Sequence, residues 1–202
     1  MLKTDTYLTI ESPAEGIFKD KGSKFLSIAY PINNEIESKN LLDKVKSKYY
    51  NANHHCYAYR LGYNGEKYKY SDDKEPSGTA GKPILGQLIS KNLTNIIVII
   101  VRYFGGTKLG ISGLINAYQQ ATISVINNAN IIEKIIKENI TISFYNNNMN
   151  QVMHILKQFN ANLILNDYVD NKFIIQFSIR KSLKDDIYFK LSNINNLDFI
   201  EV

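Results

Sequence analysis

Hydrophobic and polar residues alternate with two different periods in the last third of the chain. Apolar side chains at every second position are typical of half-buried strands, and a spacing of three to four residues is typical of amphipathic helices. The strand segments are 140–144, 161–169, 173–179 and 197–202, and the helix segments are 149–159 and 182–191. Asp170 and Asn171 predict a hairpin turn between the second and third strands. The order βαββαβ predicts a ferredoxin-like domain with two helices on one sheet face.

The preceding part of the chain shows the same two periods and is also mixed α/β. We expect strands at 7–10, 23–30, 55–61 and 96–103, and helices at 34–49, 84–89 and 109–125. The run from Ile96 to Val101 is entirely β-branched and apolar, which is typical of a buried strand. Gly113, Ala117 and Ala121 lie four residues apart, so they share a helix face that can approach a sheet closely.

An Asn-rich stretch from 127 to 139 separates the two patterns. It follows a long helical pattern and precedes a new strand pattern, so we place the domain boundary near residue 132. The sequence therefore predicts an α+β protein of two domains, 1–131 and 132–202. The second of these is the ferredoxin-like domain.

Composition narrows the class of protein. The 202 residues are 44% hydrophobic and 21% charged, which excludes disorder as the dominant state. The single cysteine, Cys56, excludes an internal disulfide framework and a cysteine-clustered metal site. The longest apolar run is far shorter than the roughly 20 residues of a membrane helix. The first residues also lack the pattern of a secretory signal, so we expect a cytoplasmic protein with no membrane partner.

The net charge of +5 is concentrated in the first part of the chain. Up to residue 125 there are 16 Lys and Arg against 11 Asp and Glu, and beyond it there are 8 of each. A basic first part is compatible with contact to nucleic acid or the ribosome. Background composition from an AT-rich genome explains the same excess, and the sequence leaves both readings open.

One segment, 71–83, interrupts the pattern of strands and helices with polar residues. It ends in a proline-containing helix start, where free backbone N–H groups favour an anion. The alternative is that the carboxylates cap and solvate a long loop. The candidate residues of this acidic loop are Asp72, Asp73, Glu75, Ser77 and Thr79, with Lys82 beside the helix start.

A second segment, 101–114, joins a buried strand to a helix through a glycine-rich turn. That arrangement places backbone N–H groups around a phosphate. It lacks the Lys-Ser/Thr of a P-loop and the spacing of the dinucleotide fingerprint. The alternative is that the glycines are required only for the geometry of the turn and for close packing of the helix on the sheet. The candidates for phosphate or nucleic-acid binding are Arg102, Tyr103, Gly105, Gly106, Thr107 and Lys108, together with Lys82.

His54 and His55 precede Cys56 and invite a metal interpretation. Neighbouring residues of a strand point to opposite faces, so the two imidazoles do not easily share one ion. The remaining histidine, His154, lies in the other predicted domain. We therefore predict no metal and no cofactor, and we assign no catalytic residue.

Segments 23–25, 54–58, 71–83 and 101–118 resemble the IMPACT/YigZ family in order and spacing across nearly the whole chain. The resemblance implies an N-terminal α/β sandwich similar to the second domain of a small-subunit ribosomal protein, with two helices on one sheet face. It implies a C-terminal domain similar to domain V of elongation factor G, and a role around translation. Lys74 and Ser112 stand where the family commonly has glycine, and the lysine disfavours a left-handed backbone at its position.

Two functions remain open. The first is a translation-associated binding protein that contacts RNA, the ribosome or a translation-regulating protein. The alternative is an enzyme acting on a nucleotide or a phosphorylated small molecule. Its acids or metal ligands would be Asp72, Asp73 and Glu75, and residues 105–107 would cradle the phosphate. Both functions require the acidic loop and the glycine turn to line one cleft. The sequence does not determine the oligomeric state.

Overall fold

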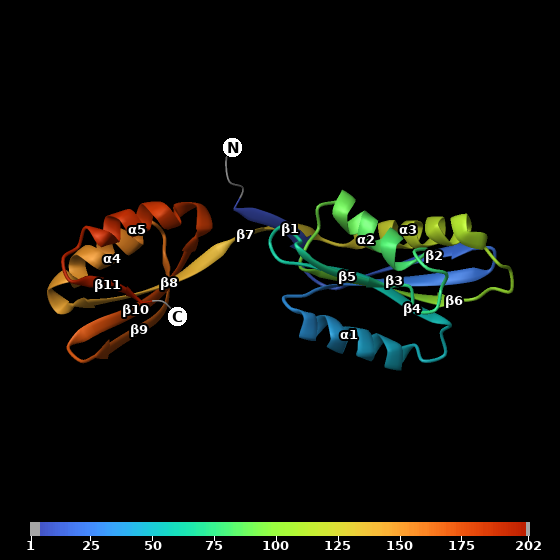
Figure 1. The fold of residues 1–202 in the computed structure, drawn as a ribbon, viewed down its shortest axis with the longest axis horizontal. Helices are drawn as coiled ribbons and strands as arrows, with labels where there is room; N and C mark the ends of the chain where they lie inside the picture. Colours follow the sequence, from blue (N-terminus) through green and yellow to red (C-terminus); the bar gives the residue numbers. More distant parts are fainter. Residues whose placement is uncertain (1–4, 201–202) are drawn as a thin grey trace. The chain divides into compact units, whose positions relative to one another are not determined.

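The computed structural model describes residues 5–200, whose contacts divide into two compact units (Figure 1). One unit runs from Tyr7 to Lys134, and the other contains, of the described residues, Asp5, Thr6 and residues 135–200. The division after Lys134 falls a few residues beyond the expected boundary at 132.

The first unit is built on an antiparallel five-stranded sheet with the order β2-β3-β6-β4-β5. Its strands are β2 (Ala14–Asp20), β3 (Ser23–Pro31), β4 (His54–Leu61), β5 (Lys67–Ser71) and β6 (Ile96–Tyr103). Helix α1 (Glu35–Lys48) covers one face of this sheet. Helices α2 (Gly81–Ser90) and α3 (Gly110–Asn128) cover the other, so this part is an α/β sandwich (Figure 1).

The central strand β6 explains why the unit has two cores. Its residues from Ile96 to Val101 are all fully buried. Because successive side chains of a strand point to opposite faces, alternate residues enter different cores. Ile96, Val98 and Ile100 join the core under α2 and α3, whereas Ile97, Ile99 and Val101 join the core under α1. The expectation of a buried strand at 96–103 is confirmed.

Helix α1 begins and packs as its sequence predicts. The side chain of Asn34 accepts a hydrogen bond from the backbone N–H of Glu37 at 2.8 Å, which caps the first turn. Val45 is buried in the α1 core, with Leu41 and Leu42 packed against it.

The sequence pattern did not predict three of the strands. Besides β2 and β5, the structure contains β7 (Ile131–Ile135), which pairs with β1 (Thr6–Ile10) in a two-stranded sheet. The Asn-rich stretch expected to separate the domains is therefore partly a strand. β5 and β7 each expose four of their five residues, and β2 buries only one of its seven, so the apolar alternation that marks a strand is weak.

The close contact between helix and sheet lies at a different glycine from the expected one. Ala117 and Ala121 are fully buried in the core. Gly113 is partly exposed, and a Cβ added there would meet the Leu109 side chain at 3.1 Å. The tight position is Gly16 on β2, where a Cβ would lie 2.7 Å from the backbone nitrogen of Val125.

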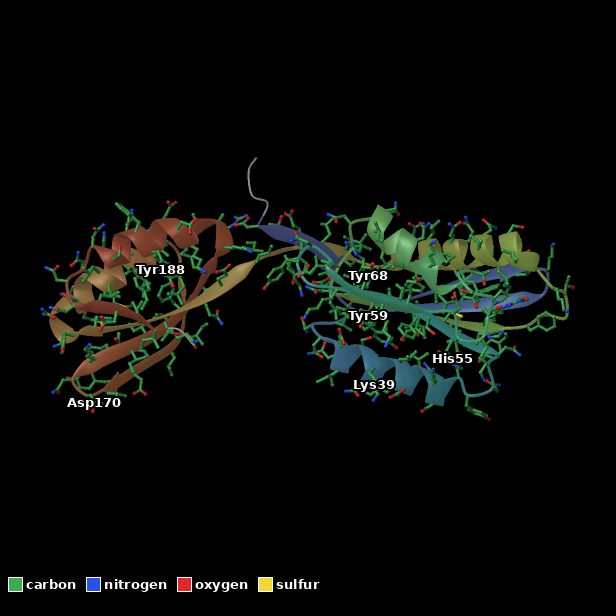
Figure 2. All side chains as sticks on the ribbon, viewed as in Figure 1. Lys39, His55, Tyr59, Tyr68, Asp170 and Tyr188 are labelled. Atoms are coloured by element: carbon green, nitrogen blue, oxygen red, sulfur yellow. The ribbon has the colours of Figure 1, made fainter. Side chains whose placement is uncertain are left out.

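The second unit confirms the predicted ferredoxin-like fold. Its elements are β8 (Lys137–Tyr145), α4 (Met149–Gln158), β9 (Asn162–Val169), β10 (Lys172–Arg180), α5 (Lys184–Ser192) and β11 (Leu197–Ile200). The sheet order is β11-β8-β10-β9, and every pairing is antiparallel. Asp170 and Asn171 both have positive φ, 50° and 64°, and form the turn at the tip of the β9–β10 hairpin (Figure 2).

Asp5 makes the stability of the second unit depend on pH. Its carboxylate accepts hydrogen bonds from Arg180 Nε and Nη2 at 2.6 and 2.9 Å, and these bonds hold the pKa of Asp5 well below its usual range. The stabilisation is complete above the unfolded pKa of about 3.9 and is lost as pH falls below it. We expect the thermal midpoint to fall more steeply between pH 5 and 2 in the wild type than in Asp5→Asn, as measured by circular dichroism. Equal pH dependence in the two proteins would contradict this assignment.

Among residues 5–200, no helix is both long enough and apolar enough to cross a bilayer.

Candidate functional site

The acidic loop and the segment that contains the glycine turn both contribute residues to one cavity, but Asp72, Asp73 and residues 105–107 are not among its lining residues. The cavity has a volume of about 360 Å³ and lies at the end of β6, beside the start of α3. Its lining residues are Glu75 and Pro76 from the acidic loop, Arg102 and Phe104 from the end of β6 and the residues after it, and Lys108, Leu109, Gly110, Ile111 and Leu114 from the turn and α3.

Asp72 caps helix α2. Its carboxylate accepts three backbone hydrogen bonds, from the N–H groups of Gly78 at 2.8 Å, Ala80 at 2.9 Å and Gly81 at 2.8 Å. A carboxylate at this end of a helix also opposes the positive end of the helix dipole. Asp72 is thus occupied by the fold, in agreement with the capping alternative of the sequence analysis.

Glu75 and Arg102 form a buried ion pair beneath the cavity. Arg102 Nη1 lies 2.5 Å from Glu75 Oε1, and the two side chains are only 6% and 4% exposed. Tyr118 donates its hydroxyl to the same carboxylate oxygen at 2.9 Å. Arg102 Nη2 points to Ser23 Oγ at 3.5 Å, whereas Arg102 Nε has no hydrogen-bond partner among the described residues. Neither charge of this pair is free, yet the guanidinium keeps one donor unused.

The ion pair rests on two buried polar groups, the Tyr118 hydroxyl and the Cys56 thiol, that were not among the predicted site residues. Cys56 Sγ lies 3.2 Å from Tyr118 Oη and 3.0 Å from the carbonyl oxygen of Asp72, so its single proton has two acceptors within reach. Burial raises the pKa of both Cys56 and Tyr118 far above their ordinary values, so both remain protonated. The one available signal was the tyrosine hydroxyl on the otherwise apolar face of the long helix, since a buried Tyr usually needs a hydrogen-bond partner.

The two histidines anchor the acidic loop to β4. His54 Nδ1 lies 2.8 Å from the carbonyl oxygen of Asp73, and His55 Nε2 lies 3.1 Å from the carbonyl oxygen of Tyr49. The backbone N–H of His55 donates to Asp73 Oδ2 at 2.6 Å. His54 Nε2 is 3.8 Å from Glu75 Oε1, at the edge of the buried ion pair. The imidazoles turn in different directions, as adjacent strand residues should.

Lys74 corrects one expectation. It adopts φ of 72° in the left-handed region, although a lysine was expected to disfavour that conformation. The carbonyl and carboxylate of the preceding Asp73 are both fixed to β4, so tertiary contacts determine the backbone there.

The glycine turn divides into a packed part and an open part. A Cβ on Gly105 would overlap the backbone of Gly22 and Ser23, and the N–H of Gly105 donates to Ser23 Oγ at 3.2 Å. Gly105 therefore serves close packing. Gly106, Thr107 and Lys108 are exposed.

Four other candidate residues lie outside the cavity lining. Tyr103 packs on the α1 side and donates its hydroxyl to Asn51 Oδ1 at 3.2 Å. Thr79 is buried and donates to the carbonyl of Pro76 at 2.7 Å, and Ser77 is exposed. Lys82 is exposed on the first turn of α2.

The start of α3 gives the cavity an electropositive wall. The first turn of this 19-residue helix contains no acidic residue, and no side chain caps it. Its free N–H groups carry partial positive charge, and Gly110 and Ile111 line the cavity beside Lys108. This wall is suited to a phosphate or carboxylate group. Among residues 5–200, no group of three or more His, Cys, Asp or Glu is placed to hold a metal ion.

Comparisons with known proteins identify similar proteins and a matching family model. Residues 21–126 match the family model described as the Impact N-terminal domain. The chain is similar to the IMPACT family member YvyE of Bacillus subtilis, with 32% identity over 86% of this chain and 84% of that protein. It is 34% identical to the IMPACT family member YigZ of Escherichia coli over 56% of this chain and 57% of that protein.

The crystal structure of a hypothetical protein aligns with 98% of both chains at a TM-score of 0.74 and 24% identity, which supports the same two-part fold.

Proposed function

Because this chain belongs to the IMPACT family, we propose that it acts in translation as a binding protein that holds a phosphate group of RNA in the cavity beside Lys108. The family resemblance supports the connection to translation. The choice of RNA rests on the chemistry of the cavity, which offers hydrogen-bond donors and positive charge to an anion.

The observation that carries this proposal is the electropositive wall that the start of α3 and Lys108 give to one cavity. The start of α3, the Lys108 side chain and the buried Arg102 all line it. Glu75 is the only carboxylate among its lining residues, and its charge is already paired with Arg102. Lys108 therefore leaves the site with a net positive charge, which favours a phosphate.

The enzymatic alternative receives less support from the same geometry. Asp72 is held by three backbone N–H groups, Asp73 by β4, and Glu75 by Arg102 and Tyr118. Carboxylates that are hydrogen-bonded inside the fold are poorly placed to bind magnesium or to transfer a proton to a substrate. A translation-regulating protein as the partner remains a separate outcome of the test below.

We expect Lys108→Ala to weaken RNA binding and to lower the salt dependence of that binding. Each phosphate contact to a single strand contributes about 0.7 to the slope of log affinity against log salt concentration, so the slope should fall by about that amount. Filter binding of single-stranded RNA from 50 to 300 mM salt measures both quantities. Lys46→Ala is the matched control, because Lys46 is an exposed lysine of α1 that does not line the cavity.

Two results would contradict the proposal. Wild-type protein that does not bind RNA, or binds it without salt dependence, would exclude phosphate recognition. Equal behaviour of Lys108→Ala and Lys46→Ala would exclude the cavity as its place. Capture from a lysate that survives nuclease treatment, combined with no RNA binding, would favour a protein partner.

A further inference from the structure

The outer strand β5 carries an alternation of lysine and tyrosine that the cavity does not use. Its sequence from Lys67 is Lys-Tyr-Lys-Tyr, and all four residues are exposed. The strand lies at the edge of the five-stranded sheet and pairs only with β4 (Figure 1). One backbone edge of β5 is therefore open.

The register places the two tyrosines on one face of the strand. Tyr68 lies opposite Arg60 of β4, and Tyr70 lies opposite Ala58. Residues two apart on a strand point the same way and are separated by roughly 7 Å. Tyr68, which Figure 2 labels, is 60% exposed. Tyr70 is 42% exposed, so both rings present area to solvent.

The two lysines lie on the opposite face of the same strand, next to solvent. Lys67 is opposite Leu61, and Lys69 is opposite Tyr59. Neither ammonium group forms an ion pair or a hydrogen bond with any described residue. Lys69 borders a groove of about 470 Å³ that also contains Glu35 and Asp43, yet it pairs with neither. The ammonium groups of both lysines are thus unpaired, along an edge whose other face offers aromatic rings.

We propose that β5 binds single-stranded RNA, with the rings of Tyr68 and Tyr70 stacking on successive bases and the lysines contacting the phosphates. This inference rests on the proposed function, because it names the strand that receives the RNA whose phosphate enters the cavity. Aromatic stacking tolerates any base, and flexible lysine side chains can follow a backbone of uniform negative charge. A duplex cannot use the tyrosines, because its bases are already stacked.

The direction of β5 agrees with a continuous path to the cavity. Ser71, at the end of β5, pairs with Tyr57 of β4, and Arg102, near the end of β6, pairs with His54. The two strands therefore end at the same end of the sheet. The acidic loop leaves β5 at this point and supplies Glu75 and Pro76 to the cavity wall.

The test compares Tyr68→Ala/Tyr70→Ala with Tyr68→Phe/Tyr70→Phe, using uniform single-stranded RNA and a duplex of the same length. A stacked base contributes enough that losing each ring should reduce affinity by about fivefold or more. We expect the alanine variant to lose at least about 20-fold in affinity for the single strand with an unchanged salt slope. The phenylalanine variant should bind as the wild type does, because it keeps the stacking area. Both side chains are exposed, so the alanine variant should unfold at the wild-type temperature.

The outcomes separate this inference from the proposed function. If the alanine variant of Tyr68 and Tyr70 binds single-stranded RNA as the wild type does and Lys108→Ala binds it weakly, the role of β5 is overturned and the role of the cavity is supported. If the alanine variant loses affinity for single-stranded RNA and Lys108→Ala binds it fully, the role of β5 is supported and the role of the cavity is overturned. If the alanine variant lost the same affinity for the single strand and for the duplex, stacking would be overturned. A loss of affinity for the single strand in the phenylalanine variant would also overturn it.

Discussion

Arg102→Ala is expected to lower the free energy of unfolding by about 3–5 kcal/mol, because it leaves a buried carboxylate without its counter-charge. Glu75 is only 4% exposed and would retain a single hydrogen bond, from Tyr118. The decrease in the free energy of unfolding should be measured by native-state hydrogen exchange of the β6 amides. Two compact units can unfold in separate transitions, and exchange reports the unit that contains the substitution.

A double variant provides the control for this prediction. Glu75→Leu with Arg102→Met removes both charges at once, and replacing a buried ion pair by apolar residues of similar size is often nearly neutral. We expect the double variant to recover most of the stability lost in Arg102→Ala. If both proteins lost the same amount, the ion pair would not be the source of the effect. The same reasoning makes Arg102 unsuitable for testing RNA contact, since its removal affects the fold, and Lys108 takes its place.

The second large effect is expected at Asp72. Asp72→Ala should lower the free energy of unfolding by at least about 2 kcal/mol, because Ala80 and Gly81 are buried and each unsatisfied buried donor costs about 1–3 kcal/mol. The measurement is urea unfolding followed by far-ultraviolet circular dichroism, with hydrogen exchange of the α2 amides to locate the change.

Two further substitutions define what Asp72 contributes. Asp72→Asn keeps one acceptor oxygen and should lose less stability than Asp72→Ala. Ser77→Ala is the matched control in the same loop, because its side chain is exposed and makes no hydrogen bond with any described residue. That variant should remain within about 0.5 kcal/mol of the wild type. A similar loss in the alanine variants of Asp72 and Ser77 would show that the loop tolerates no change at all, and the capping role would fail.

The sequence predicted those elements whose hydrophobic pattern is strong. The run from Ile96 to Val101 was recognisable because the strand is buried on both faces and is therefore apolar throughout. The βαββαβ order was recognisable because each of its elements has one apolar face. Strand β5 was missed because its residues alternate lysine with tyrosine and none of its first four side chains is buried. Pairing with β4, and not apolar character, makes it a strand.

The sequence identified the two segments that contribute to the candidate site, but it did not predict the hydrogen bonds and the ion pair between their side chains. The glycine turn and the acidic loop were singled out from their composition, and the structure brings some residues of the two segments, Glu75 and Lys108 among them, to one cavity. The pairing of Arg102 with Glu75 joins residues 27 positions apart, and Tyr118 joins from 43 positions away. Such partners are selected by strand register and helix packing, which a single sequence does not encode locally.

The burial of Cys56 has a practical consequence for every binding measurement suggested above. It is the single cysteine of the chain, and its thiol is enclosed and protonated beside Tyr118. Maleimide dyes react with exposed thiolates, so they should leave the folded wild-type protein unlabelled. A protein carrying Gln151→Cys, at an exposed position of α4 in the other unit, would accept one fluorophore at a known position without any need to remove the native cysteine.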